Sequence, residues 1–213
     1  MIPDRIVRHP RRVALTSLAF AGASVSLVAL LLHAAGWLPL YFAVDLLGAP
    51  SLMLLAVLGV FANRVREEIF FSRLATGAWA GLAATGAYDL IRLAIRESGL
   101  IHFDPFLSHP IFGRLITNAP ETTTMAIVVG WAYHLWNGLG LGLMYVLVAG
   151  PAPWYFALAW ALVLEIAWLA TLPSVLHLSV SAAFVTVGFV GHGAYGVVLG
   201  LLAQRFTRKG ELL

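Results

Sequence analysis

Two histidines occupy matching places in two glycine-rich segments. Residues 129–138 read VGWAYHLWNG, and residues 187–196 read VGFVGHGAYG. Each histidine has a glycine four residues before it, four residues after it and eight residues after it, so these residues follow one helix face. The two sets are His134 with Gly130, Gly138 and Gly142, and His192 with Gly188, Gly196 and Gly200. Glycine stripes let membrane helices pack closely, so we expect both histidines to face neighbouring helices.

One acidic residue lies in the apolar segment before each histidine segment, Asp89 before the first and Glu165 before the second. An ionisable group inside a bilayer costs a few kcal/mol, so four such groups at similar depth indicate a polar site. Two imidazoles and two carboxylates suit zinc, iron or manganese. We therefore predict a metal site formed by His134, His192, Glu165 and Asp89. Haem b between the two histidines is an alternative, and so is a proton or cation relay without a cofactor.

Three further polar residues lie close to this predicted site. Asn137 follows His134 and Tyr195 follows His192 by nearly one helical turn, and both could bind substrate or move protons. Hydrogen bonding between helices would explain the same two residues equally well. Arg92 lies one turn after Asp89 and could pair with its carboxylate, which would remove Asp89 from the metal site.

The segment 97–121 also contains possible ligands, namely His102, Asp104 and His109. Their spacing fits no known ligand pattern, and we interpret these residues as part of an interfacial or solvated loop. The segment as a whole is rich in apolar residues, so we expect it to lie on the membrane or to fold back over the helix ends. The chain has no cysteine, which excludes disulfides, thiolate metal sites and iron–sulfur clusters. It also has no phosphate-binding loop, no His-Glu-x-x-His and no nucleophile elbow.

The composition indicates an integral membrane protein. Apolar residues make up 61% of the 213 residues and charged residues 11%, whereas soluble proteins carry roughly a quarter charged residues. About 20 apolar residues are needed to cross a bilayer. Six ranges satisfy this requirement: 13–35, 40–62, 74–96, 122–149, 153–173 and 181–204. The fold class predicted is thus an all-α, six-helix membrane bundle.

Basic residues predict the orientation of the bundle. The net charge of +3 is no sign of nucleic-acid binding, because the arginines lie at the ends of apolar segments. With both termini in the cytoplasm, most of them fall on the cytoplasmic side, as the positive-inside rule requires. This group comprises Arg5, Arg8, Arg11, Arg12, Arg64, Arg66, Arg73, Arg205, Arg208 and Lys209.

The two histidine segments divide the chain into repeated units. We expect one transmembrane domain, 1–213, with a first helix pair in 1–63, one repeat in 74–149 and a second in 153–205. Each repeat is an acid-bearing helix followed by a glycine–histidine helix in the same direction. Parallel repeats of this kind are commonly related by an axis along the membrane normal.

Residues 77–92, GAWAGLAATGAYDLIR, the His134 helix with its glycines, and residues 192–200, HGAYGVVLG, resemble the YagU-like uncharacterised bacterial inner-membrane proteins. The resemblance covers the last four expected spans and leaves out the first two and the Phe-rich loop. It implies a location in the bacterial inner membrane and no particular activity.

Three classes of function fit these residues. A metal-dependent membrane enzyme is the leading hypothesis. A proton-coupled or small-solute transporter and a non-catalytic subunit of a membrane complex are the alternatives. The expected partners are the lipid bilayer and a second copy or another subunit of a membrane complex.

Overall fold

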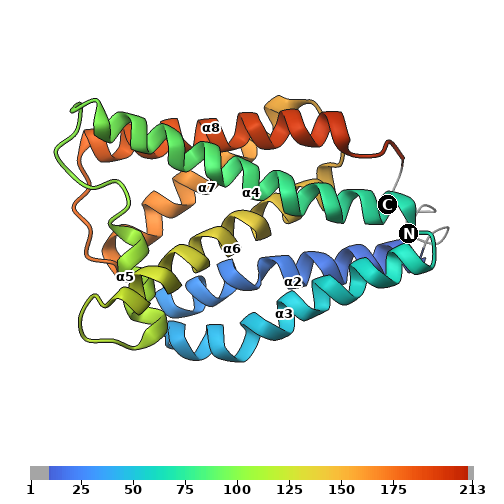
Figure 1. Ribbon diagram of the computed structural model, residues 1–213, viewed down its shortest axis with the longest axis horizontal. Coiled ribbons are helices and arrows are strands. Elements are labelled where there is room, and N and C mark those ends of the chain that lie inside the picture. The colour runs from blue at the N-terminus through green and yellow to red at the C-terminus, as the bar shows by residue number, and fades with distance from the viewer. Residues whose placement is uncertain (1–9, 211–213) are drawn as a thin grey trace.

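The fold is entirely helical in the part of the chain that the computed structural model describes, residues 10–210. The all-α prediction is confirmed there, because this part contains seven helices and no strand. Figure 1 shows them as a long bundle with one short helix at its end. The helices are α2 (Pro10–Ala34), α3 (Leu40–Arg64), α4 (Glu68–Glu97), α5 (Ser108–Thr117), α6 (Thr124–Ala149), α7 (Trp154–Val175) and α8 (Ala182–Phe206).

Four of the described helices, α2, α3, α7 and α8, are long and apolar enough to cross a membrane. The chain is therefore a helical membrane protein. Helices α4 and α6 have 30 and 26 residues, which give lengths of about 45 and 39 Å. They are long enough to span. Helix α4 carries the ionisable residues Asp89 and Arg92, and α6 carries His134.

The two ends of the bundle differ in character. Helix α2 begins and α8 ends at one end of the bundle, whereas α5 lies at the opposite end (Figure 1). At the first end Arg12 pairs with Glu67 at 2.9 Å, and one pocket is lined by Arg66, Arg205 and Arg208. Fewer basic residues, Arg92, Arg96 and Arg114, lie toward the α5 end. Arg5 and Arg8, which also support the predicted orientation, lie outside the described residues.

Helix α4 is central to the packing of the bundle. It packs against both α6 and α8, while α7 packs against α8 and α2 packs against α3 and α6. Glycines bring α4 and α6 to backbone contact. A Cβ on Gly81 would lie 2.7 Å from the Gly138 carbonyl oxygen, and one on Gly142 would lie 2.4 Å from the Gly81 Cα. Larger residues there would push the two helices apart.

The repeated segments share local structure. The Thr123 hydroxyl accepts a hydrogen bond from the backbone N–H of Ala126, and the Ser181 hydroxyl accepts one from Phe184. Each therefore caps its helix, and each cap precedes its histidine by the same number of residues. The packing is less symmetric, because α6 and α7, both fully described, lack the extensive contact that joins α4 and α8. The repeat and its domain division stay a prediction.

A helix occupies part of the segment that we expected to be a loop. Helix α5 packs on the first turns of α6, and two glycines make this possible. A Cβ on Gly113 would lie 1.6 Å from the Ala126 carbonyl oxygen, and one on Gly130 would lie 1.9 Å from the His109 carbonyl oxygen. The segment thus folds back over the helix ends, and it carries His109 into the protein.

Candidate metal site

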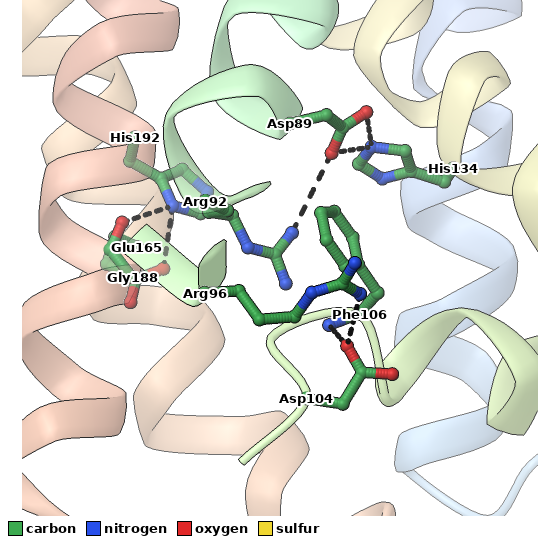
Figure 2. Close-up of polar contacts among 9 residues, drawn as sticks. All are labelled: Asp89, Arg92, Arg96, Asp104, Phe106, His134, Glu165, Gly188 and His192. Carbon is green, nitrogen blue, oxygen red and sulfur yellow. Dashed lines mark hydrogen bonds and ion pairs between the residues drawn. The ribbon is translucent and has the colours of Figure 1, made fainter. Parts of the chain in front are cut away.

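A hydrogen-bonded pair joins α4 to α6 near the end that carries α5. The Nε2 atom of His134 lies 3.1 and 3.0 Å from the two carboxylate oxygens of Asp89. Figure 2 shows the pair, with the Arg92 guanidinium on the other side of Asp89. The Nη1 atom of Arg92 lies 3.8 Å from Oδ1 of Asp89, so the predicted pairing of these two residues is present.

The imidazole of His109, from α5, completes a cluster with this pair. Its ring stacks on the ring of His134, with centroids 4.2 Å apart and planes 29° apart, and it meets the edge of Trp131 at 4.3 Å. Only 2% of His109 is exposed. Its Nδ1 atom is buried without a hydrogen-bond partner among the described residues. It is one of seven buried side-chain nitrogen or oxygen atoms without a partner among the described residues, and it is the one that lies beside the His134–Asp89 pair. A bound ligand is one way to satisfy such an atom.

His109 is an uncharged base in this environment. Its pKa is lowered to about 2, mainly because burial disfavours the imidazolium and also because His134 and Arg92 lie nearby. Neutral imidazole is the form that binds metals. A stacked, buried and neutral histidine beside a second histidine is therefore suited to be a ligand.

Asp89, His109 and His134 each offer one ligand atom, and these atoms lie within 4.8 Å of one another. Two imidazoles and one carboxylate are a common ligand set for catalytic zinc and for non-haem iron. Bonds of 2.0–2.1 Å would place tetrahedral ligand atoms about 3.4 Å apart. The three side chains must therefore draw together slightly when an ion binds.

A second pair joins α7 to α8. The Nδ1 atom of His192 lies 2.8 Å from Oε2 of Glu165 and 3.1 Å from the Gly188 carbonyl oxygen (Figure 2). Because that carbonyl can only accept, Nδ1 carries the proton and Nε2 is left without one when the ring is neutral. Glu165 is only 2% exposed. A Cβ on Gly188 would lie 1.9 Å from Oε1 of Glu165, so this glycine makes room for the carboxylate.

Two residues of α4 lie between the pairs. The Tyr88 ring has its centroid 5.8 Å from that of His134 and 5.0 Å from that of His192. The guanidinium carbon of Arg92 lies 4.5 Å from the Tyr88 centroid and 4.9 Å from the Phe106 centroid. The four residues predicted as metal ligands are thus placed in two pairs, with Tyr88 between the histidines.

Both pairs border one cavity of about 580 Å³. Its lining includes residues from six helices, all except α3. The polar part of the lining contains Tyr88, Arg92, His109, His134, Asn137, Glu165, His192 and Tyr195. A cavity of this size with a few convergent polar groups is typical of small-molecule sites.

The other residues predicted for the site have identified partners. Nδ2 of Asn137 donates to the Tyr133 carbonyl one turn earlier in α6, at 3.1 Å. The Tyr195 hydroxyl donates to the Gly138 carbonyl at 2.9 Å, which links α8 to α6. Both residues also line the cavity. Hydrogen bonding therefore accounts for their polarity, and a role with substrate stays a prediction.

The six glycines of the two stripes lie at close approaches between chain segments or against polar side chains. A Cβ on Gly138 would lie 1.8 Å from the Thr85 hydroxyl oxygen. On α8, a Cβ on Gly196 would lie 2.7 Å from the Leu158 Cα, and one on Gly200 would lie 2.4 Å from the Trp154 carbonyl oxygen. Gly130, Gly142 and Gly188 have the contacts given above.

Sequence reasoning named His109 as a possible ligand but did not place it in the predicted metal site. The interpretation of the outer segment as a solvated or interfacial loop is correct for His102 and Asp104, which are exposed. It is wrong for His109, which is buried. The available signal was Gly113, placed one turn after His109, together with Gly130 before His134. Paired small residues indicate a close contact, but no spacing rule links two segments so far apart.

The fold and the cluster define a helical membrane protein with a possible metal site. No family model, curated protein or solved structure matches the chain.

Proposed function

We propose that this chain is a six-span membrane metalloenzyme whose divalent transition metal is held by Asp89, His109 and His134. The buried, unpartnered nitrogen of His109 beside the His134–Asp89 pair carries this proposal. Zinc, iron and manganese all accept such a ligand set. The resemblance to YagU-like proteins supports a place in the bacterial inner membrane. The gathering of basic residues at the end without α5 supports cytoplasmic termini.

A metal at this place would polarise a bound oxygen atom or activate water. The chain's own groups supply the remaining functions. His192 borders the same cavity, and Glu165 fixes its protonated Nδ1. Its Nε2 atom is then available to accept or return a proton. Arg92 provides a fixed positive charge beside Asp89 for an anionic group.

A proton-coupled or small-solute transporter is the second candidate. Its support is the arrangement of His134, Tyr88, His192 and Glu165 around one cavity, with Asp89 behind His134, which would suit a proton relay. Haem b is less well supported, because each histidine is held by a carboxylate and Tyr88 lies between them. A role as a subunit of a membrane complex needs no metal at all.

Elemental analysis after purification from metal-supplemented cells tests the proposal. We expect about one zinc, iron or manganese per chain in the wild type. His109→Ala should lower the content at least tenfold, since removing one of three protein ligands rarely leaves a tight site. His102→Ala is the matched control, because His102 lies in the same segment but is exposed. A wild-type content below about one tenth of a metal ion per chain would contradict the proposal, and so would equal metal contents in His109→Ala and His102→Ala.

A further inference from the structure

The lining of the cavity beside the metal site contains both polar and apolar side chains. Its polar part, which we call the polar wall, includes Arg92, His134 and His192. Apolar side chains of α2, α5, α7 and α8 also line it, namely Leu27, Leu30, Phe112, Leu164, Leu172 and Phe184. A molecule with a polar group and an apolar part would match such a lining best.

The cavity reaches the surface in two places. Asp104, Leu107, His177, Ser179 and Ser181 are exposed lining residues in the loops at the α5 end, and a second mouth lies between two membrane helices. Helices α2 and α7 have very little contact with each other. Leu31 on α2, and Ala167 and Thr171 on α7, line the cavity and are exposed. They lie close to the helix ends that share a side with α5. In the proposed orientation this mouth faces the outer leaflet, so a ligand could enter from the lipid.

The charge on the polar wall favours an anion, and this step rests on the proposed metal. Asp104 also lines the cavity, but its carboxylate is exposed and pairs with Arg96 at 3.8 Å. A divalent ion together with Arg92 would then outweigh the carboxylates of Asp89 and Glu165. Arg92 also has donors to offer, because its nearest contact with Asp89 is 3.8 Å, longer than a direct charged hydrogen bond of about 2.8 Å. A guanidinium next to a metal is a strong site for carboxylate or phosphate oxygens.

We infer that the cavity binds a single-chain amphiphile with an oxyanion head, which enters from the outer leaflet between α2 and α7. The head lies between Arg92 and the metal site, and the chain lies along the wall that contains Leu27, Leu30 and Leu164. The proposed enzyme would then act on the head group of a membrane-dissolved acid or phosphate. Arg92 and the metal site would recognise the oxyanion that both head groups share, and competition distinguishes carboxylate from phosphate.

Photolabelling in nanodiscs tests this inference. The probe is hexadecanoate with a diazirine in its chain, and the labelled peptides are mapped by mass spectrometry. We expect labels to concentrate on the cavity-lining parts of α2 and α7. Excess hexadecanoate or hexadecyl phosphate should reduce labelling at least fivefold. The more effective competitor shows whether the site prefers a carboxylate or a phosphate head group. Hexadecyltrimethylammonium of equal chain length should reduce it less than twofold. Labels spread over all lipid-facing helices, or equal competition by the cation, would overturn the inference.

Variants separate the head site from the chain site. Leu31→Trp should narrow the mouth and reduce labelling at least fivefold. Leu52→Trp is its control, because Leu52 is similarly exposed but lies on α3, outside the lining. Arg92→Gln should reduce labelling severalfold, and Arg92→Lys should restore part of it. Equal labelling of Leu31→Trp and Leu52→Trp would contradict entry between α2 and α7.

Metal content, measured on the same samples, distinguishes this inference from the proposed function. If the protein contains stoichiometric metal but its labelling is unspecific, the amphiphile inference is wrong and the metalloenzyme proposal still stands. If labelling is specific and depends on Arg92 but the protein contains no metal, the metalloenzyme proposal is wrong and the amphiphile site still stands. If both hold, removal of the metal by chelation should weaken labelling severalfold, because the head then loses a cation.

Discussion

The imidazole of His109 stacks on that of His134, although the two come from different helices, with centroids 4.2 Å apart. The contact exists because α5 lies against the backbone of α6 at Gly130. Gly130 thus affects both the packing of the outer segment and the geometry of the candidate metal site.

Replacing Gly130 by alanine should disrupt this contact. The new Cβ would lie 1.9 Å from the His109 carbonyl oxygen, so α5 must move and take His109 with it. We expect a loss of stability of about 1–3 kcal/mol, as in overpacked cores, and at least a tenfold weaker metal affinity. Thermal unfolding in detergent and metal titration measure the two effects.

Gly86→Ala on α4 is the control for that prediction. Nothing lies within 4 Å of its Cβ position, so alanine should be neutral or slightly stabilising. Equal behaviour of the two variants would show that α5 is not held against α6 at this point.

The contribution of the buried Glu165 to stability should come more from its hydrogen bond to His192 than from its charge. Glu165→Ala leaves His192 without its carboxylate and opens a void, so we expect a loss of about 3 kcal/mol. Glu165→Gln keeps the shape and one hydrogen-bond acceptor for His192, and it should lose less than half as much. Unfolding of both variants in the same detergent measures the difference. A glutamine variant as unstable as the alanine variant would mean that the charge itself holds α7 to α8.

The orientation can be measured directly because the chain has no cysteine. Single cysteines can be introduced at Leu100, which is 77% exposed near α5, and at Asn63, which is exposed at the opposite end. A membrane-impermeant maleimide should label Leu100→Cys in intact cells with a permeable outer membrane. Asn63→Cys should react only after the inner membrane is lysed. The reverse pattern would place the termini outside.

Asp89 should contribute to metal affinity as a ligand and to stability as the partner of Arg92. Asp89→Asn removes one ligand charge and leaves the buried guanidinium of Arg92 without its carboxylate. We expect metal affinity to fall about 10- to 100-fold, with a clear loss of thermal stability. The double variant Asp89→Asn with Arg92→Gln should regain part of that stability but none of the affinity. If the double variant is no more stable than the single one, the Asp89–Arg92 pair contributes little.

The sequence predicted the long helices well, because apolar runs of the length of a bilayer have few alternatives to a helix. The six expected ranges agree with the bounds of α2, α3, α4, α6, α7 and α8 to within a few residues, except at the start of α4. Glycines at positions of close approach were also recognisable by their spacing.

The grouping of the site residues could not be predicted in the same way. Which acid meets which histidine depends on how α4 packs between α6 and α8, and the Tyr88 ring keeps the two pairs apart. The part played by His109 depends on a short helix that folds back on α6. Helical periodicity reports the face of one helix, and it carries no information on such contacts between distant segments.

X-ray absorption spectroscopy of the metal-loaded protein tests the central claim most directly. The account predicts two imidazole nitrogens and one carboxylate oxygen at about 2.0–2.2 Å from the metal, if the ion is zinc. His109→Ala should lose one imidazole from this shell, whereas His192→Ala should leave the shell unchanged. A shell that loses an imidazole in His192→Ala and stays intact in His109→Ala would contradict a metal site at Asp89, His109 and His134.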